Sequence, residues 1–201
     1  MKTYIYFIRH GKVNNPKNIW YGRLPGFSLE KKGRLQIEKT ARFLAGKKID
    51  ILYSSKLLRA RQSAQIIKDK LKLTEINFSK KILEVQSSLE GKSFSYISSI
   101  EYDVFADSDT GINGETLENL ASRMQKFISE IIKKHRGKKI AVISHGDPIM
   151  IVKALSDGLP VKNSSLRPGK TKYIQHGEVY LLEYNGDKKN KIVSIFNPTG
   201  E

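Results

Sequence analysis

The sequence predicts one α/β domain with a largely parallel central sheet, and three observations support this prediction. Short apolar runs rich in β-branched and aromatic residues alternate with segments of helical periodicity, the pattern of strand–helix–strand units. The 201 residues match one ordinary domain, and no repeat or linker divides them. The apolar content of 39% suffices for a folded core. We therefore expect a single domain over residues 1–201, with a small polar insertion at about 85–115.

The expected elements come from the apolar runs and the turn signals between them. The run over 3–8 predicts a buried strand, and Pro25–Gly26 in the loop behind it suits a tight turn. The serines that end "IDILYSS" are suited to cap a helix. In chain order, the expected elements are a strand over 3–8, a helix over 29–45, a strand over 49–53, helices over 57–71 and 116–135, the strand "KKIAVIS", the helix "HGDPIMIVKAL", and strands over 177–184 and 191–196, separated by a hairpin-like turn at "NGDKKN".

The chain is strongly basic, with 36 Lys plus Arg against 20 Asp plus Glu and a formal net charge of +16. Basic pairs recur mostly at expected helix ends and in loops, without the interleaved aromatic residues of a stacking platform. We interpret the excess as a solvated, lysine-rich surface and expect no nucleic-acid partner. The sequence has no cysteine, so no disulfide or thiolate site is expected. It also has no signal-peptide core and no stretch long enough to span a bilayer, which predicts a cytoplasmic protein without membrane contact.

Two apolar runs end in the same way, with one polar residue followed by His–Gly. These runs are "IYFIRHG" and "IAVISHG". In parallel α/β sheets, ligands bind outside the carboxyl ends of the strands. His10 and His145 would therefore lie close together at this end of the sheet, which we call the rim. Arg9 beside His10 favours an anionic ligand over a metal, and no third ligand stands at metal-site spacing. The sequence therefore predicts an anion site at this rim, and no metal.

A further pair of arginines and two further histidines need placing. Arg59 and Arg61 stand in "SSKLLRARQSA", where a helix N-terminus and a guanidinium fork would both hold phosphate oxygens. His135, in "KKHRGKK", is expected at a solvated helix end. His176 is also followed by glycine, but it precedes a strand instead of ending one. We therefore expect His176 in a loop away from the rim.

Four segments follow one another along nearly the whole chain. They are R-H-G at 9–11, S-K-L-L-R-A-R-Q-S-A at 55–64, G-E-T-L from Gly114 with Arg123 behind it, and S-H-G at 144–146. In this order and spacing they resemble the motifs of the histidine phosphatase superfamily. The resemblance implies a phosphoglycerate mutase-like fold, a three-layer α/β sandwich with a largely parallel sheet and a short central insertion over the site.

The resemblance also implies roles for these residues. His10 would be the nucleophile that attacks phosphorus and forms a phosphohistidine. Arg9, Arg59 and the second catalytic histidine, His145, would bind the phosphoryl oxygens, with Gly146 beside them. These residue types fit phosphoryl transfer, which needs positioning and charge stabilisation, and nearby arginines favour a neutral, nucleophilic imidazole. No cofactor or metal is implied.

An acid must also protonate the leaving oxygen, and the family uses a carboxylate of the inserted region for this. Glu84, Glu90 and Glu115 are the candidates, and Glu84 matches the family position best. In the loop after R-H-G, Asn15 and Arg23 are expected substrate-binding residues.

This loop departs from the family pattern directly after R-H-G. Lys12 and Val13 stand where the family usually has Glu or Gln followed by Thr. Val13 has no hydroxyl to donate, and Lys12 would add positive charge near the remote end of the substrate.

Three functions remain open at this point. We expect a metal-independent phosphomonoester hydrolase that acts on a small phosphorylated metabolite. The first alternative is phosphoryl transfer of the phosphoglycerate mutase type, and the second is a non-catalytic, basic protein that binds polyanions on the same fold. The short insertion favours hydrolysis over the mutase, and the intact set of arginines and histidines disfavours the binding protein.

Overall fold

Six strands form one sheet in the order β3-β2-β4-β1-β5-β6 across the described part of the chain. The computed structural model describes residues 1–105, 114–166, 173–185 and 188–200, with the backbone alone for 188–191. The sheet is mostly parallel, as predicted, because five of these described strands, β1, β2, β3, β4 and β6, run in one direction and β5 alone runs against them. The strands are β1 (Thr3–Arg9), β2 (Ile51–Ser55), β3 (Asn77–Ser79), β4 (Lys139–Ser144), β5 (Val179–Asn185) and β6 (Lys188–Phe196).

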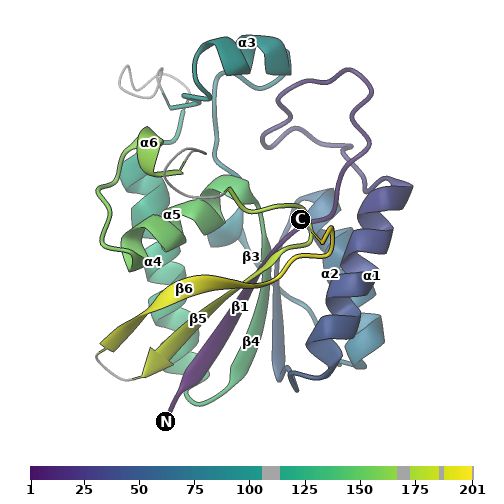
Figure 1. The fold of residues 1–201 in the computed structure, drawn as a ribbon, viewed down its shortest axis with the longest axis vertical. Helices are drawn as coiled ribbons and strands as arrows, with labels where there is room; N and C mark the ends of the chain where they lie inside the picture. Colours follow the sequence, from purple (N-terminus) through teal and green to yellow (C-terminus); the bar gives the residue numbers. More distant parts are fainter. Residues whose placement is uncertain (106–113, 167–172, 186–187, 201) are drawn as a thin grey trace.

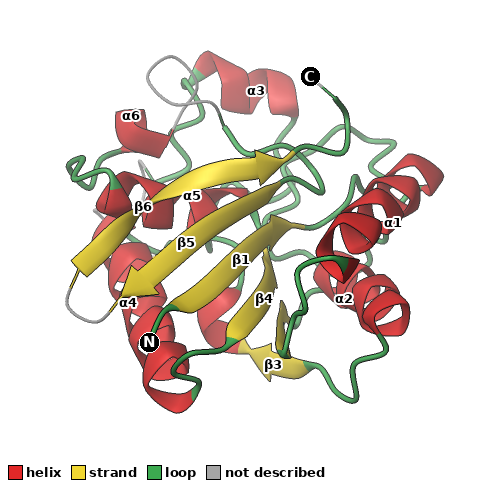
Figure 2. Cartoon of the chain, turned by 60° about the horizontal axis from the view of Figure 1, so that its bottom comes forward, coloured by secondary structure: helices red, strands yellow, loops and turns green. Residues whose placement is uncertain are grey.

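Helices cover both faces of the sheet and make the three layers that the sequence predicted (Figures 1 and 2). α1 and α2 pack on one face, and α4 and α5 pack on the other. α3 lies apart from both layers, beyond the carboxyl ends of the parallel strands (Figure 1). Among the described residues, no helix combines the length and apolar character needed to cross a membrane. The helices are α1 (Lys31–Ala45), α2 (Leu58–Leu71), α3 (Phe94–Ser99), α4 (Leu117–Lys134), α5 (Gly146–Ser156) and α6 (Asn163–Leu166), with a 3-10 turn at Lys80–Ile82.

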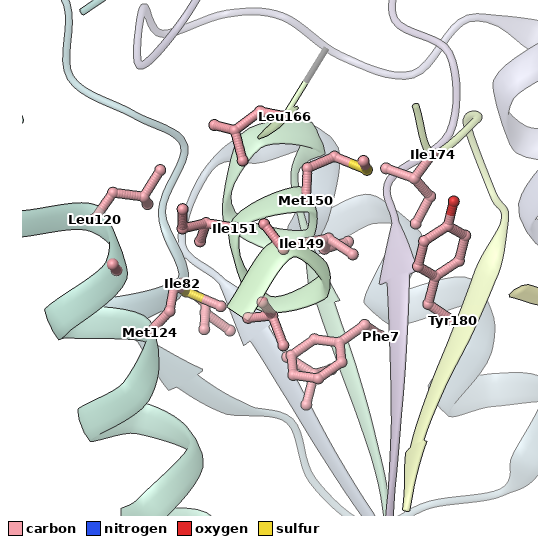
Figure 3. Packing of buried hydrophobic residues seen from close by; sticks show 14 of the residues in the cluster. Phe7, Ile82, Leu120, Met124, Ile149, Met150, Ile151, Leu166, Ile174 and Tyr180 are labelled. Atoms are coloured by element: carbon pink, nitrogen blue, oxygen red, sulfur yellow. The ribbon is translucent and has the colours of Figure 1, made fainter. Parts of the chain in front are cut away.

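The alternation of side chains along β1 explains why both faces are covered. Ile5 and Phe7 belong to the apolar cluster under α4 and α5, whereas Tyr6 and Ile8 belong to the cluster under α1 and α2. Figure 3 shows the first cluster, in which Phe7 lies below α5 and beside Tyr180 of β5. A strand buried on both faces reads as a continuous apolar run, and this is how β1 appears in the sequence.

The predicted strands and helices are present, with ends displaced by a few residues. The turn expected at "NGDKKN" includes residues 186–187, which lie outside the described residues, and the strands on either side of it pair antiparallel. Three short elements were not predicted, namely β3, α3 and α6. The described part of the predicted insertion is more ordered than its polar sequence indicated, since Ile97, Val104 and Phe105 are buried in it, and residues 106–113 lie outside the described residues.

Candidate active site

The carboxyl ends of β1 and β4 bring two of the predicted histidines together. His10 follows β1 and His145 follows β4, and the backbone N–H of His10 donates to the carbonyl of Ser144 at 3.1 Å. The two ring centroids lie 5.1 Å apart in an edge-to-face arrangement. Both side chains are buried, with exposed fractions of 1% and 0%. The two His–Gly steps therefore share one rim, as the strand ends predicted.

The hydrogen bonds of His10 indicate its tautomer. Its Nδ1 lies 2.8 Å from the carbonyl oxygen of Gly11, which only accepts, so we assign the proton to Nδ1. Nε2 then presents its lone pair, and it accepts a hydrogen bond from Nε of Arg59 at 3.0 Å. Burial lowers the pKa of His10 well below its usual value, and the positive charge of Arg59 lowers it further. His10 is therefore a neutral imidazole, with its lone pair on Nε2.

Arg59 is a buried cation at the start of α2, with 1% of its surface exposed. Its Nη2 donates to the carbonyl of Gly22 at 2.7 Å, and its guanidinium carbon lies 4.8 Å from the ring centroid of Tyr21. Neither contact neutralises its charge, which an anion at the rim would do. Arg61 lies over Phe78 instead and is exposed to solvent. Of the two arginines in this segment, Arg59 is the one that reaches the rim.

Three nitrogen atoms near His10 are cut off from solvent and have no hydrogen-bond partner in the described part of the chain. They are Nε of Arg9, Nδ1 of His145 and Nε2 of His176. Nε2 of His145 lies 2.7 Å from Oγ of Ser55, and we assign the proton of this bond to the hydroxyl, which places the imidazole proton on Nδ1. Buried polar nitrogens without partners are costly, and a bound anion would satisfy those that carry a proton. His145 also precedes the first residue of α5, whose N-terminus adds a favourable dipole for an anion.

His176 lies at this rim, and the prediction that placed it away from the site is wrong. Its ring centroid is 5.5 Å from that of His10, and the backbone N–H of Gly177 donates to the carbonyl of Arg9 at 2.9 Å. The reason is the direction of β5, which runs antiparallel to β1, so the start of β5 meets the end of β1. The signal in the sequence was the third His–Gly step. By contrast, His135 is distant from the rim as expected, with its Nε2 2.9 Å from the hydroxyl of Tyr53.

Of the three candidate acids, only Glu84 lines a cavity beside the rim. It is 6% exposed, and its Oε1 accepts a hydrogen bond from the backbone N–H of Val85 at 3.0 Å. Burial, and then the nearby charge of Asp147, raise the pKa of Glu84 to about 7. A carboxyl group with this pKa carries a proton near neutral pH and can donate it.

The other two carboxylates are engaged elsewhere. Oε1 of Glu90 accepts a hydrogen bond from the backbone N–H of Arg23 at 2.7 Å. Glu115 forms ion pairs with Arg23 and Arg123, whose guanidinium also donates to the carbonyl of Lys81. These contacts tie Glu90 and Glu115 to Arg23 and Arg123, whereas the side chain of Glu84 accepts a hydrogen bond from the backbone of its neighbour Val85 and lines the cavity.

The remaining predicted residues lie around the rim without completing it. Asn15 exchanges hydrogen bonds with the backbone of Ile19, which closes a tight loop. This loop lines the smaller of two cavities at the rim, which are described below. The guanidinium of Arg23 donates hydrogen bonds to Glu115, to Gln86 and to the carbonyl of Glu84. Arg23 lines neither cavity.

Two further residues have structural explanations. Lys12 pairs with Glu30 at 3.1 Å, so its charge is already matched. Gly146 packs so tightly that a Cβ there would meet the hydroxyl oxygen of Tyr173 at 2.0 Å.

Two cavities open at the rim, and they share Arg9, Tyr21, Phe94 and His176. The first has a volume of about 410 Å³ and contains Glu84 in its wall. The second, of about 340 Å³, lies between the loop after β1 and the start of α1. Within the described residues, no three His, Asp or Glu side chains are grouped as metal ligands would be. The rim can therefore hold an anion, with space on two sides for the group attached to it.

Comparison with known proteins gives one family and several relatives. The family described as the histidine phosphatase superfamily (branch 1) matches residues 5–197. Phosphoglycerate mutase-like protein 4 of Arabidopsis thaliana is 31% identical over 155 residues, which cover 72% of this chain and 67% of that protein.

Two solved structures show the same fold. A mycobacterial glucosyl-3-phosphoglycerate phosphatase matches with a TM-score of 0.77 at 17% identity, covering 98% of this chain and 99% of that chain. A phosphoserine phosphatase of Entamoeba histolytica, in complex with phosphoserine, matches with a TM-score of 0.76 at 20% identity, covering 98% and 97%.

Proposed function

Because the chain belongs to the histidine phosphatase superfamily, we propose that it is a metal-independent phosphomonoester hydrolase that works through a phosphohistidine on a small phosphorylated substrate. The observation that carries the proposal is Nε2 of His10, a buried, neutral nucleophile beside a buried cation. The arginines supply the positive charge on which phosphoryl transfer depends. The cytoplasmic location and the lack of a nucleic-acid partner stay predictions from the sequence.

In the first step, the lone pair of His10 Nε2 attacks phosphorus, a P–N bond forms, and the P–O bond to the alcohol breaks. Arg59 transfers its hydrogen bond from Nε2 to a phosphoryl oxygen, and the unpartnered nitrogens of Arg9 and His145 bind the others. Glu84, which its raised pKa keeps protonated up to about pH 7, gives its proton to the leaving oxygen. The alcohol leaves neutral, and the phosphoryl group stays on His10.

In the second step, water attacks the phosphohistidine from the side that the alcohol vacated. Glu84, now a carboxylate, takes a proton from that water as the new P–O bond forms and the P–N bond breaks. Inorganic phosphate is released, His10 returns to its neutral form, and Glu84 is again an acid. The same carboxyl group therefore acts in both steps, and the protonation states of His10 and Glu84 are restored at the end of the cycle.

Transfer to a second substrate oxygen, as in a mutase, is the second candidate. The match to a phosphoglycerate mutase-like protein, which covers 72% of this chain, favours this transfer. We place hydrolysis first because the central insertion in the sequence is short. A basic protein that only binds polyanions is the weakest alternative, since binding does not require a neutral, buried nucleophile.

Hydrolysis of p-nitrophenyl phosphate in EDTA tests the proposal, with wild type and His10→Ala compared at equal folded concentration. We expect turnover in EDTA that is lost in His10→Ala, together with an acid-labile phosphoryl label on the wild-type protein. No hydrolysis by the wild type, with phosphoryl transfer between phosphoglycerates, would establish the mutase instead. Neither activity, with salt-sensitive binding of RNA, would establish the binding protein.

A further inference from the structure

The leaving group of the substrate can be placed from the residues that line the two cavities. Both cavities reach the rim, but Glu84 lines the first and not the second. A general acid must lie within hydrogen-bond reach of the oxygen that it protonates. The alcohol that leaves with the proton of Glu84 therefore occupies the first cavity.

The wall of the first cavity is dominated by aromatic side chains. Trp20 and Tyr21 come from the loop after β1, Phe94 and Tyr102 from the insertion, and Tyr173 from the segment before β5. The rings of Trp20 and Phe94 meet edge to face, with centroids 6.1 Å apart. Small-molecule sites that bind apolar groups are lined in this way, with few polar groups at fixed places.

Backbone hydrogen bonds between the loop and the insertion hold this wall together. The backbone N–H of Trp20 donates to the carbonyl of Lys92 at 2.7 Å, and that of Gly91 donates back to the carbonyl of Trp20 at 2.8 Å. The N–H of Phe94 donates to the carbonyl of Asn18 at 3.0 Å, which fixes the insertion to the loop. A cavity whose wall is ordered beforehand loses little free energy on closing around a ligand.

Among the described residues, the charges around the first cavity leave no cation for a second anionic group. Arg9 is the one cation in its wall among the described residues; its Nη1 donates to the carbonyl of Ile174 at 2.8 Å, and the proposed mechanism assigns its Nε to the phosphoryl group. Lys12 lines only the second cavity and pairs with Glu30 at 3.1 Å. Arg23 pairs with Glu115 at 3.0 Å. A carboxylate or second phosphate on the alcohol would lose its water without gaining a cation, and Glu84 would oppose it once ionised.

From these observations we propose that the substrate is the phosphomonoester of an uncharged, largely aromatic or apolar alcohol, which binds against Trp20, Phe94 and Tyr173. Esters whose alcohol carries a charge, such as phosphoserine and phosphoglycerate, are poor substrates of this protein. The inference rests on the proposed hydrolysis, because it assigns the alcohol to the cavity that contains the acid.

A panel of alkyl phosphates tests this substrate class without a change of leaving-group chemistry. The measured quantity is kcat/KM for 2-phenylethyl phosphate, ethyl phosphate, O-phosphoserine and 3-phosphoglycerate. We expect the phenylethyl ester to exceed each of the others by about tenfold or more, because apolar pocket contacts give discrimination of this order. Equal values, or a preference for either charged ester, would overturn the proposal.

Two substitutions in α3 locate the preference. Phe94→Ala removes a ring that lines the cavity, whereas Tyr96→Ala removes an exposed ring from the same helix. We expect Phe94→Ala to lower the ratio of the phenylethyl to the ethyl value about threefold or more, and Tyr96→Ala to leave that ratio unchanged. An unchanged ratio in Phe94→Ala, with its far-ultraviolet circular dichroism intact, contradicts the proposed position.

A binding experiment separates failure of this inference from failure of the proposed hydrolysis. Calorimetry with 2-phenylethylphosphonate and ethylphosphonate requires no turnover. If no ester is hydrolysed but the phenylethyl compound binds about tenfold more tightly, the hydrolase proposal fails and the aromatic cavity stands. If the two dissociation constants are equal, the aromatic cavity does not select the ligand and the inference is wrong, whatever the activity.

Discussion

The rim and the cavity wall meet at one site, but they are built in different ways. The rim lies at the ends of β1 and β4 and at the first turns of α2 and α5, and its side chains have fixed partners, as Arg59 has in His10. The wall lies in the loop after β1 and in the insertion, where backbone hydrogen bonds between two irregular segments position aromatic rings. Under the proposed function, the sheet would supply the phosphoryl chemistry for any ester, and the segments that carry the wall would select the ester. A change in the rim should lower turnover of every substrate, and a change in the wall should alter the ratio between substrates.

The largest effect on turnover is expected from the loss of the proposed acid, Glu84, which lies beside the rim. Glu84→Gln keeps the size of the side chain but cannot donate a proton, so kcat/KM for ethyl phosphate should fall about 10²–10⁴-fold. The decrease for p-nitrophenyl phosphate should be much smaller, because p-nitrophenolate leaves without a proton. Steady-state kinetics with both esters measures the two decreases. Glu90→Gln is the matched control, and a larger loss in that variant would move the acid to Glu90.

The pH profile sharpens the same assignment. Burial and Asp147 raise the pKa of Glu84 to about 7, and the acid must be protonated to act, so kcat/KM for ethyl phosphate should fall as the pH rises above about 7. His10 has a pKa well below its usual value, so it stays neutral throughout this range. The alkaline decrease near pH 7 should be absent in Glu84→Gln. If the variant keeps it, another group titrates there.

The next largest effect is expected from substitution of Arg59. Its two hydrogen bonds, from Nε to His10 and from Nη2 to Gly22, require the forked guanidinium group. Arg59→Lys keeps the positive charge, but a single ammonium cannot reproduce the fixed geometry of the bonds to His10 and Gly22. We expect kcat/KM to fall about 10²–10³-fold for ethyl and phenylethyl phosphate alike, as for the loss of one preorganised donor. Arg61→Lys, two residues further along α2, should change neither value. Unequal losses for the two esters would mean that Arg59 also belongs to the wall.

Most of the rim could be predicted because regular elements place it. His10 and His145 each follow an apolar run that is buried on both faces, and burial fixes the register of such strands. The parallel pairing of these runs then brings the two residues together. Arg59 follows the third such run within one helical turn. These positions need only local patterns and the rule that ligands bind at the carboxyl ends of parallel strands.

His176 and the wall escaped prediction for two different physical reasons. The apolar run of β5 does not indicate whether the strand runs parallel or antiparallel to its neighbour. The structure shows that β5 pairs antiparallel with β1, which brings His176 to the rim. Trp20 and Phe94 stand in segments without periodicity, and they meet through backbone bonds between positions far apart in the chain, such as Trp20 and Lys92. Propensity and periodicity describe residues that are close in sequence, so they do not predict contacts between distant segments.

A smaller effect, on stability, is expected where β1 meets α1. A Cβ on Gly11 would lie 2.3 Å from the carbonyl oxygen of Gly33, and backbone on both sides leaves little room to adjust. Gly11→Ala should therefore lower the free energy of unfolding by about 1–3 kcal/mol, the range for overpacking. Gly46→Ala, where the nearest atom would be 3.9 Å away, should change it little. Urea denaturation measures both, and equal stabilities would mean that the chain relaxes around Gly11 at no cost.

The smallest effect concerns His176, which an irregular segment brings to the rim. Its Nε2 has no partner among the described residues, and burial lowers its pKa well below the usual value, so it is a neutral ring close to the phosphoryl site. If Nε2 donates to a phosphoryl oxygen, His176→Leu should lower kcat/KM about tenfold for ethyl and phenylethyl phosphate equally. His176→Gln, which keeps a donor near the same place, should recover most of this loss. His135→Leu, the same change away from the rim, should have no effect on either value. A loss confined to the phenylethyl ester would assign His176 to the wall instead of the rim.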